Sequence, residues 1–420
     1  MNSETSAVPR PVPKRRAFSA FARSDFRFYV IGATLAMMAD NIEHVISYWV
    51  LFQRFHSAAL AGFAVISHWV PWLLLGGLGG ALADRYDTRR LIQAGMILFV
   101  MVSLSWGVMF QTGAVHLWAA MLLLVVHGVA GVIWLPAAQV LIHRMVSTDE
   151  LVSAVRVNAT GRYLGFLVGP AIGAVLLLSL GPALGIFANA LIYLPLFLWL
   201  LRAPYGRQSP ATLEPTAAAA GFGDIFSTMR VIAAHPVLSA ATLLTGGASF
   251  FVGNAYQAQM PGFARDLGHG RADFSYSLLL GADAAGGLAG GVILESRGLL
   301  RPHARTAFLL AMVWCGTLIG FARTHFYPLA LALLFTAGFT ELSFNSMAQA
   351  LVQLHAPSAI RGRVIGVFSM SSLGLRAFSG ISVGLVGARI GIHNSLALSA
   401  GALLAFCVVL YGWRFSRRGA

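Results

Sequence analysis

Twelve long apolar stretches, separated by short polar turns, dominate the sequence. A helix needs about 20 residues to cross the ~30 Å hydrocarbon core of a bilayer, and each stretch is about that long or longer. Only 10% of the residues are charged, whereas soluble domains carry about 25%. The chain therefore has too little charge to cover a water-facing surface, and we predict an all-α membrane protein with twelve transmembrane helices. The stretches are residues 27–53, 60–83, 90–110, 115–143, 152–180, 184–202, 236–260, 272–295, 304–322, 327–354, 362–388 and 393–414.

The longest break between stretches, residues 203–235, follows the sixth one and contains several prolines and an alanine run. Such a composition is typical of a linker. It predicts two six-helix halves, residues 27–202 and 236–414, with an N-terminal tail at 1–26 and a C-terminal tail at 415–420.

Positive charge is distributed unevenly over the loops. The net charge is +14, and arginines concentrate in both tails, in the linker and in alternate turns. By the positive-inside rule both termini and the linker are expected in the cytoplasm. Nucleic-acid binding is not expected, because it needs a solvated basic face, and these arginines lie between apolar stretches. The first stretch lacks a small-residue cleavage site and is expected to be retained.

A short basic loop joins the second and third stretches. It contains Gly80, Asp84, Arg85, Arg89 and Arg90. It has a weaker copy 211 positions later, with Gly291 for Gly80, Glu295 for Asp84 and Arg301 for Arg90.

Further residues recur at similar shifts. Stretches four and ten share Gly128 and Gly338, Trp134 and Phe344, and Gln139 and Gln349, all 210 apart; stretches five and eleven share Arg162 and Arg376, and Gly173 and Gly387, both 214 apart. Consistent shifts over three helix pairs predict a parallel repeat of two pseudo-symmetric halves. Such repeats place the substrate path at the interface between the halves, near the middle of the membrane.

With these features the whole chain resembles the major facilitator superfamily of secondary transporters. The loop around Asp84 is similar to that family's Gly-x-x-x-Asp-Arg-x-Gly-Arg-Arg loop, although Asp87 stands where a glycine is usual. The resemblance implies a cytoplasmic gate built from this loop and its copy, in which Asp84 meets the start of a neighbouring helix, where the helix dipole favours an acid.

A second motif resembles the Gly-x-x-x-Gly-Pro-x-x-Gly signature of the drug–proton antiporter branches. It consists of Gly165, Gly169, Pro170 and Gly173. Glycines four residues apart make a smooth helix face for close packing, and Pro170 removes a backbone hydrogen bond and can kink the helix.

Three shorter segments are most similar to the bacterial exporters that include enterobactin-type siderophore exporters and macrolide efflux pumps. They are Pro136-Ala137, Asp149-Glu150-Leu151 and Arg361-Gly362-Arg363. The resemblance implies a multi-pass protein of the bacterial inner membrane. The family's span-four arginine is absent here: Leu124 occupies its position, and His127-Gly128 replaces the Gln-Gly end of the motif.

Ionisable residues inside the spans are functional candidates, because each costs about 2.5–3.5 kcal/mol to insert. Asp40, Glu43 and His44 share one helix face in the first span. We expect Asp40, assisted by Glu43, to carry the coupled proton. A structural ion pair with an arginine is the alternative, as is a later start of the span that leaves Glu43 and His44 near the outer rim. Asp283 is a further candidate for proton coupling.

The second half offers candidates for substrate contact. Glu341 and Asn345 lie one turn apart, and Asn254 and Gln257 are neutral hydrogen-bonding groups. Glu341 could instead pair with Arg376, and the neutral groups could bond neighbouring helices. Trp134 and Phe344 are candidates for an apolar part of the cavity, although ordinary packing or interfacial anchoring is the expected role of most such aromatics. His68 and His127 are expected as ordinary polar contacts between helices.

Arg162 and Arg376 are expected to lie deep in the membrane and therefore to need partners. Two hypotheses stay open for them. They form a charge latch with carboxylates of the opposite half, or they clamp an anionic substrate.

No enzyme constellation is present. The chain lacks a Walker loop and any cofactor motif, and Cys315 and Cys407 both lie in apolar stretches without metal-ligand spacing. We therefore expect no enzyme, no cofactor and no metal site.

The sequence as a whole predicts a monomeric secondary transporter in contact with membrane lipids. We expect proton-coupled export of an amphipathic organic compound, such as a drug or a siderophore. The alternatives are an importer or facilitator of a small metabolite, and a sensor or lipid-moving protein on the same fold.

Overall fold

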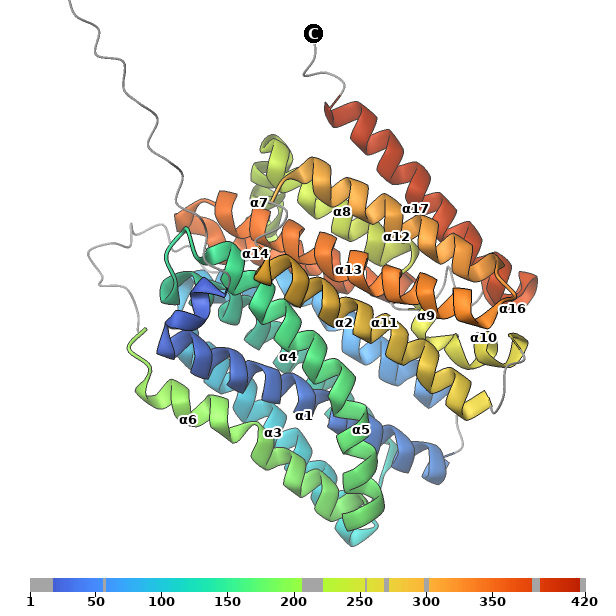
Figure 1. The fold of residues 1–420 in the computed structure, drawn as a ribbon. Coiled ribbons are helices and arrows are strands. Elements are labelled where there is room, and N and C mark those ends of the chain that lie inside the picture. Colours follow the sequence, from blue (N-terminus) through green and yellow to red (C-terminus); the bar gives the residue numbers. More distant parts are fainter. Residues whose placement is uncertain are drawn as a thin grey trace, which may run out of the picture.

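The computed structural model describes residues 18–55, 58–205, 222–253, 255–267, 272–297, 302–379 and 386–415, and all regular structure in them is helical. Figure 1 shows long helices lying roughly side by side in two groups. The first group holds the elements η1 (Ser19–Ala22), α1 (Ser24–Phe55), α2 (Ala58–Arg85), α3 (Thr88–Thr112), α4 (Leu117–Met145), α5 (Leu151–Ile192) and α6 (Leu194–Arg202).

The second group begins after the linker. It holds α7 (Phe222–Ala234), α8 (Pro236–Phe251), α9 (Ala255–Ala258), α10 (Met260–Asp266), α11 (Ala272–Ser296), α12 (Ala304–Arg323), α13 (Tyr327–His355), η3 (Ser358–Ile360), α14 (Arg361–Ser369), the π-helical turn η4 (Met370–Gly374), α15 (Arg376–Ser379), α16 (Val386–Ile390) and α17 (Ile392–Phe415).

The observed helices match the predicted membrane crossings. Eight of those described are long and apolar enough to span a membrane, and the bent pair α7–α8 gives a ninth. One of the eight, residues 151–202, is 52 residues long and reverses at Gly181, whose φ of 75° precedes Pro182, so it crosses twice (Figure 1). With α1 and the broken helix α14–α15, the all-helical fold of two six-helix halves is confirmed.

Three predicted elements have other shapes than expected. The second part of the linker is helix α7, which meets α8 at an angle of 109°. The seventh stretch does not continue to residue 260, because α8 ends at Phe251 and Gly253 adopts a positive φ of 51°. The eleventh stretch is interrupted by the π-helical turn directly before Arg376.

The glycines of the span-five motif bring α5 and α1 together. A Cβ atom at Gly165 would lie 2.7 Å from the carbonyl oxygen of Thr34, and one at Gly169 would lie 2.7 Å from the Cβ of Asn41. Only glycine permits this approach. The motif therefore packs two helices of the same half.

The two halves touch mainly toward the end of the molecule that carries Asp84, Arg156 and Glu295, here called the Asp84 end. The buried core of the first half continues there into α14 through Val364, Ile365 and Phe368. Further toward the middle, Gly287 packs on Tyr163 and Gly374 packs on Leu73.

Candidate functional site

A cavity of about 1000 Å³ lies between the halves, at the upper end of the range for ligand pockets. Helices α1, α2, α4 and α5 line it on one side, and α13, α14 and α15 on the other. Its wall combines aromatic side chains such as Trp69, Trp72 and Phe378 with a few polar ones. Nearest the Asp84 end it is bounded by Gln139, Gln349 and Phe368. The cavity thus begins where the contact between the halves ends.

His127 joins the two acids of α1. Its Nε2 lies 2.7 Å from Oδ1 of Asp40, and its Nδ1 lies 2.8 Å from Oε1 of Glu43. Ser103 donates a hydrogen bond to the other oxygen of Glu43, and Asn189 donates to Ser103 at 3.5 Å. Asp40 lines the cavity, whereas Glu43 is 2% exposed and lies behind it.

This triad holds at least two protons, one in each of its two hydrogen bonds. An ionised carboxylate only accepts hydrogen bonds, and a neutral imidazole donates from one nitrogen. Two carboxylates on one imidazole therefore require either a cationic His127 or a protonated acid. The arrangement is suited to binding and releasing a proton next to the cavity. Sequence reasoning assigned His127 an ordinary contact; the available signal was a histidine in span four, at the same depth as Asp40.

The second half contains a pair of buried acids. The hydroxyl of Tyr256 lies 3.1 Å from Asp283 and 3.1 Å from Glu341, and Gln257 donates to Asp283 at 2.9 Å. Tyr163, from the first half, also lines the cavity. Glu341 lines the cavity, whereas Asp283 is 2% exposed and lies outside its lining.

The predicted charge latch is not formed in this conformation. Arg162 and Arg376 both line the cavity, but among the described residues neither has a carboxylate within 4 Å, and both Nε atoms lack a hydrogen-bond partner. The guanidinium carbon of Arg376 lies 5.2 Å from the ring centre of Trp69, a cation–π distance. The nearby acids are already bonded to Tyr256 and to His127, which explains why they do not pair with these arginines.

Of the other candidates for substrate contact, some line the cavity and one does not. Asn345, Gln257 and Trp134 line the cavity. Phe344 does not: it is fully buried against Trp314 of α12, with ring centres 5.4 Å apart. The prediction for Phe344 was wrong because the repeat matched it to Trp134, while its side chain faces the core of its own half. Asn254 lies outside the described residues.

Asp84 fastens the two halves together. Its carboxylate accepts hydrogen bonds from the backbone N–H groups of Gly362 at 2.5 Å and Arg363 at 2.7 Å, at the start of α14. The Arg363 side chain also reaches Asp224 of α7 at 3.2 Å. Gly80 makes the approach possible, since a Cβ there would overlap the carbonyl oxygen of Gly362.

Glu295 makes the corresponding link on the other side of the interface. It accepts hydrogen bonds from the hydroxyl of Ser153 and from the backbone N–H of Phe18, the latter at 3.0 Å. Arg156 lies 3.8 Å from Glu295 and donates to the carbonyl oxygen of Leu294 at 3.0 Å. Two acids at repeat-related positions therefore hold the Asp84 end closed.

The remaining loop residues stay within the first half. Asp87 caps α3 by accepting from the N–H of Arg89 at 2.9 Å, and the Arg89 side chain bonds both Asp87 and the carbonyl oxygen of Ala203. Burial alone would raise the pKa of Asp87, but the hydrogen bonds and charge of Arg89 hold it below its usual value. Arg85 lies over the ring of Tyr86 and Arg90 is exposed. Arg301 lies outside the described residues.

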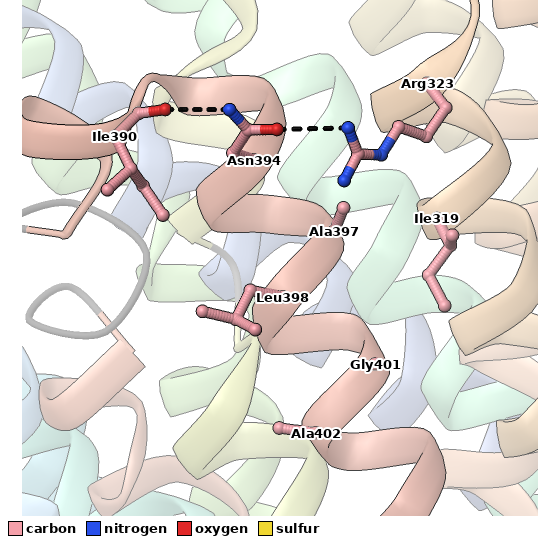
Figure 2. A pocket seen from close by; sticks show the side chains of 8 residues that line it. All are labelled: Ile319, Arg323, Ile390, Asn394, Ala397, Leu398, Gly401 and Ala402. Atoms are coloured by element: carbon pink, nitrogen blue, oxygen red, sulfur yellow. Dashed lines mark hydrogen bonds between the residues drawn. The ribbon is translucent and has the colours of Figure 1, made fainter.

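A second hollow, of about 460 Å³, lies between α12 and α17. Figure 2 shows Arg323 bonded to Asn394 above a wall of small and aliphatic side chains. This hollow lies within the second half. Its lining contains Arg323 but no acid and no histidine, so the lining offers no group for proton chemistry.

A family model described as transmembrane secretion effector matches residues 15–419. The chain belongs to this family. It is therefore a secondary transporter of the major facilitator superfamily, a multi-pass membrane protein with a small-molecule substrate, and not an enzyme.

Solved structures show the same fold at low identity. FucP of Escherichia coli in the outward conformation has 13% identity and a TM-score of 0.73, covering 93% of this chain and 98% of that chain. The human organic anion transporter MFSD10 has 16% identity and a TM-score of 0.69, covering 92% and 99%. A bacterial homologue of the iron transporter ferroportin in the outward-facing state has 14% identity and a TM-score of 0.70, covering 93% and 99%. No curated protein sequence matches the chain.

Proposed function

We propose that this transporter exports an amphipathic organic compound in exchange for protons. The triad of Asp40, His127 and Glu43 carries the proposal. It places a shared proton between three groups, two of which, Asp40 and His127, line the cavity. The description of the family as a secretion effector supports the outward direction of substrate transport.

The orientation follows from charge. Arginines concentrate in the loops at the Asp84 end, so the positive-inside rule assigns this end to the cytoplasm of a bacterial inner membrane. The closed contacts of Asp84 and Glu295 are then cytoplasmic, and the conformation faces outward. In this state the triad is reached from outside, where a proton-motive force supplies protons.

The coupling acts through differential binding. A proton that binds the triad from outside neutralises Asp40 and weakens its attraction to His127, and the same proton leaves toward the cytoplasm when the cavity faces inward. A ligand shifts a conformational equilibrium only by its difference in affinity for the two states. Substrate and proton are therefore exchanged across the membrane if they favour opposite conformations of the transporter, one facing inward and the other facing outward.

The cavity wall supports an amphipathic substrate. Trp69, Trp72 and Phe378 offer apolar surface, and Gln257 and Asn345 offer neutral hydrogen-bonding groups. No carboxylate of the described residues engages Arg162 or Arg376, so both are available to an anionic group on the substrate. A drug-like acid or a siderophore, as carried by the enterobactin-type exporters that the sequence resembles, fits this combination.

The deciding experiment is flux in proteoliposomes. Purified protein is reconstituted with its cytoplasmic face outward, an inside-acidic gradient is imposed, and uptake is measured for a panel of drugs and siderophores. We expect uptake that collapses with a protonophore and is lost in Asp40→Asn. Gradient-driven uptake at the wild-type rate in Asp40→Asn would show that the triad is not required for proton coupling. Transport only in the opposite direction would show an importer.

A further inference from the structure

Three histidines from three helices meet at the wall of the cavity: His44 of α1, His68 of α2 and His127 of α4. Their ring centres lie 4.8 to 5.9 Å apart. One nitrogen of each ring lies within 4.8 Å of a nitrogen of the other two. Their spacing in the sequence follows no ligand motif, which is why no metal site was expected.

Contacts between the helices do not account for both nitrogens of His68. Its Nδ1 is fully buried and has no hydrogen-bond partner in the part of the chain that the structure describes. A buried polar atom without a partner is unfavourable, because its lost contact with water is not replaced. Its ring stands edge-on to His44, and both rings line the cavity, so this free nitrogen belongs to the cluster.

His127 is already oriented as a metal ligand would be. Glu43 bonds its Nδ1 at 2.8 Å and is itself held by Ser103, so Nε2 faces Asp40 and the cavity. A histidine that binds a metal usually gives its other nitrogen to a carboxylate, which fixes the ring. Glu43 is in the position of that carboxylate.

We propose that the cavity binds a divalent first-row transition-metal ion through His44, His68 and Nε2 of His127, with the Asp40 carboxylate as fourth ligand. Imidazole and carboxylate together suit Zn²⁺, Co²⁺, Fe²⁺ or Ni²⁺. Asp40 lies 2.7 Å from His127 and 3.8 Å from His44, two of the three histidines. Ligand nitrogens at about 2.0–2.1 Å from the ion stand closer together than in this conformation, so small side-chain movements complete the site.

This site goes beyond the proposed export function, because ion binding at equilibrium depends on neither transport direction nor organic substrate. It has a consequence for that function. The ion occupies the space between Asp40 and Nε2 of His127, where the triad holds its proton. Metal and proton therefore compete for the same atoms. A bound ion either blocks proton coupling or is transported together with the organic compound that chelates it.

The test uses Co²⁺ alone, added to full-length protein in detergent after purification without a polyhistidine tag. We expect one Co²⁺ per chain, with visible absorption bands of nitrogen and oxygen coordination, displaced by Zn²⁺. His68→Gln and the double variant His44→Ala/His68→Ala should lose this ion. Glu43→Gln should weaken binding by roughly 10- to 100-fold, and His116→Ala, a change at an exposed histidine, should leave it intact.

Size-exclusion profiles and thermal melts show whether each variant is folded, and the near-isosteric His68→Gln retains the shape of the site where alanine does not. Absence of Co²⁺ binding by the wild type overturns the proposal. So does binding by a folded His68→Gln variant with wild-type affinity and spectrum. A loss of binding in His116→Ala equal to that in His68→Gln assigns the ion to the surface and also overturns it.

Discussion

The carboxylate of Asp84 accepts a hydrogen bond from the backbone N–H of Arg363 at 2.7 Å, although the two residues are 279 positions apart and belong to opposite halves. The neighbouring N–H of Gly362 bonds the same carboxylate. Asp84 therefore caps a helix of the other half. A cap that can form only when the halves meet stabilises one conformation of the transporter over the other.

Replacing Asp84 with Asn should shift the transporter away from the closed Asp84 end. Asparagine keeps one acceptor oxygen but loses the charge and the second hydrogen bond, at a cost of about 1 kcal/mol, which changes the ratio of two conformations about fivefold. The measurement is maleimide labelling of a cysteine placed at Gln139, at the bottom of the cavity. Labelling from the Asp84 end should rise, and the native Cys315 and Cys407 are buried.

Asp87→Asn is the matched control for this change. Asp87 also caps a helix, α3, but within its own half. The Asp87→Asn variant should be less stable than the wild type, but labelling of the cysteine placed at Gln139 should be unchanged. Equal labelling in the wild type and Asp84→Asn would show that the cap does not control access.

Gly80→Ala should prevent closure at the Asp84 end by sterics alone. A Cβ at Gly80 would overlap the backbone of α14, whereas one at Gly401 of α17 would meet nothing within 4 Å. We expect Gly80→Ala to increase labelling at Gln139 more than Asp84→Asn does, with reduced transport. Gly401→Ala should resemble the wild type in both assays. Unchanged labelling in Gly80→Ala would contradict the closed packing described here.

Hydropathy and charge predict the helices well where a helix is continuous. The third stretch, expected at 90–110, is α3 at Thr88–Thr112, and the fourth, expected at 115–143, is α4 at Leu117–Met145. Burial in a bilayer demands a long apolar run and closed backbone hydrogen bonding, so composition alone locates such spans. Helix α7 was missed because a short amphipathic helix lacks that run. It is placed by packing on α2 and α14.

The site was harder to predict from the sequence than the helices were, because its geometry depends on which helix faces meet. The i, i+3 spacing placed Asp40 and Glu43 on one face, but only tertiary packing places His127 between them. The repeat paired Phe344 with Trp134, yet equivalent positions face different neighbours in the two halves. The role of Asp87 was readable in principle, since an aspartate directly before a helix is a preferred cap.

His127→Gln should uncouple the transporter. Glutamine can hydrogen-bond Asp40 and Glu43, but it cannot carry a proton at neutral pH. Proton-driven flux in proteoliposomes should disappear, while substrate counterflow without a gradient continues. The same substitution at the exposed His116 is the control and should change neither activity. Gradient-driven flux that survives in His127→Gln would move the coupling site to Asp283 and Glu341.

Tyr256→Phe should destabilise the second half of the protein. The Tyr256 hydroxyl lies between Asp283 and Glu341 at 3.1 Å from each, so its removal leaves two buried carboxyl groups without a shared partner, at a cost of about 1–3 kcal/mol. The matched control is Tyr193→Phe, since the buried Tyr193 hydroxyl has no hydrogen-bond partner in the described part of the chain. Thermal unfolding in detergent should show a lower melting temperature for Tyr256→Phe and an unchanged or higher one for Tyr193→Phe. Equal melting temperatures for the two variants would show that the Tyr256 hydroxyl does not stabilise the acid pair.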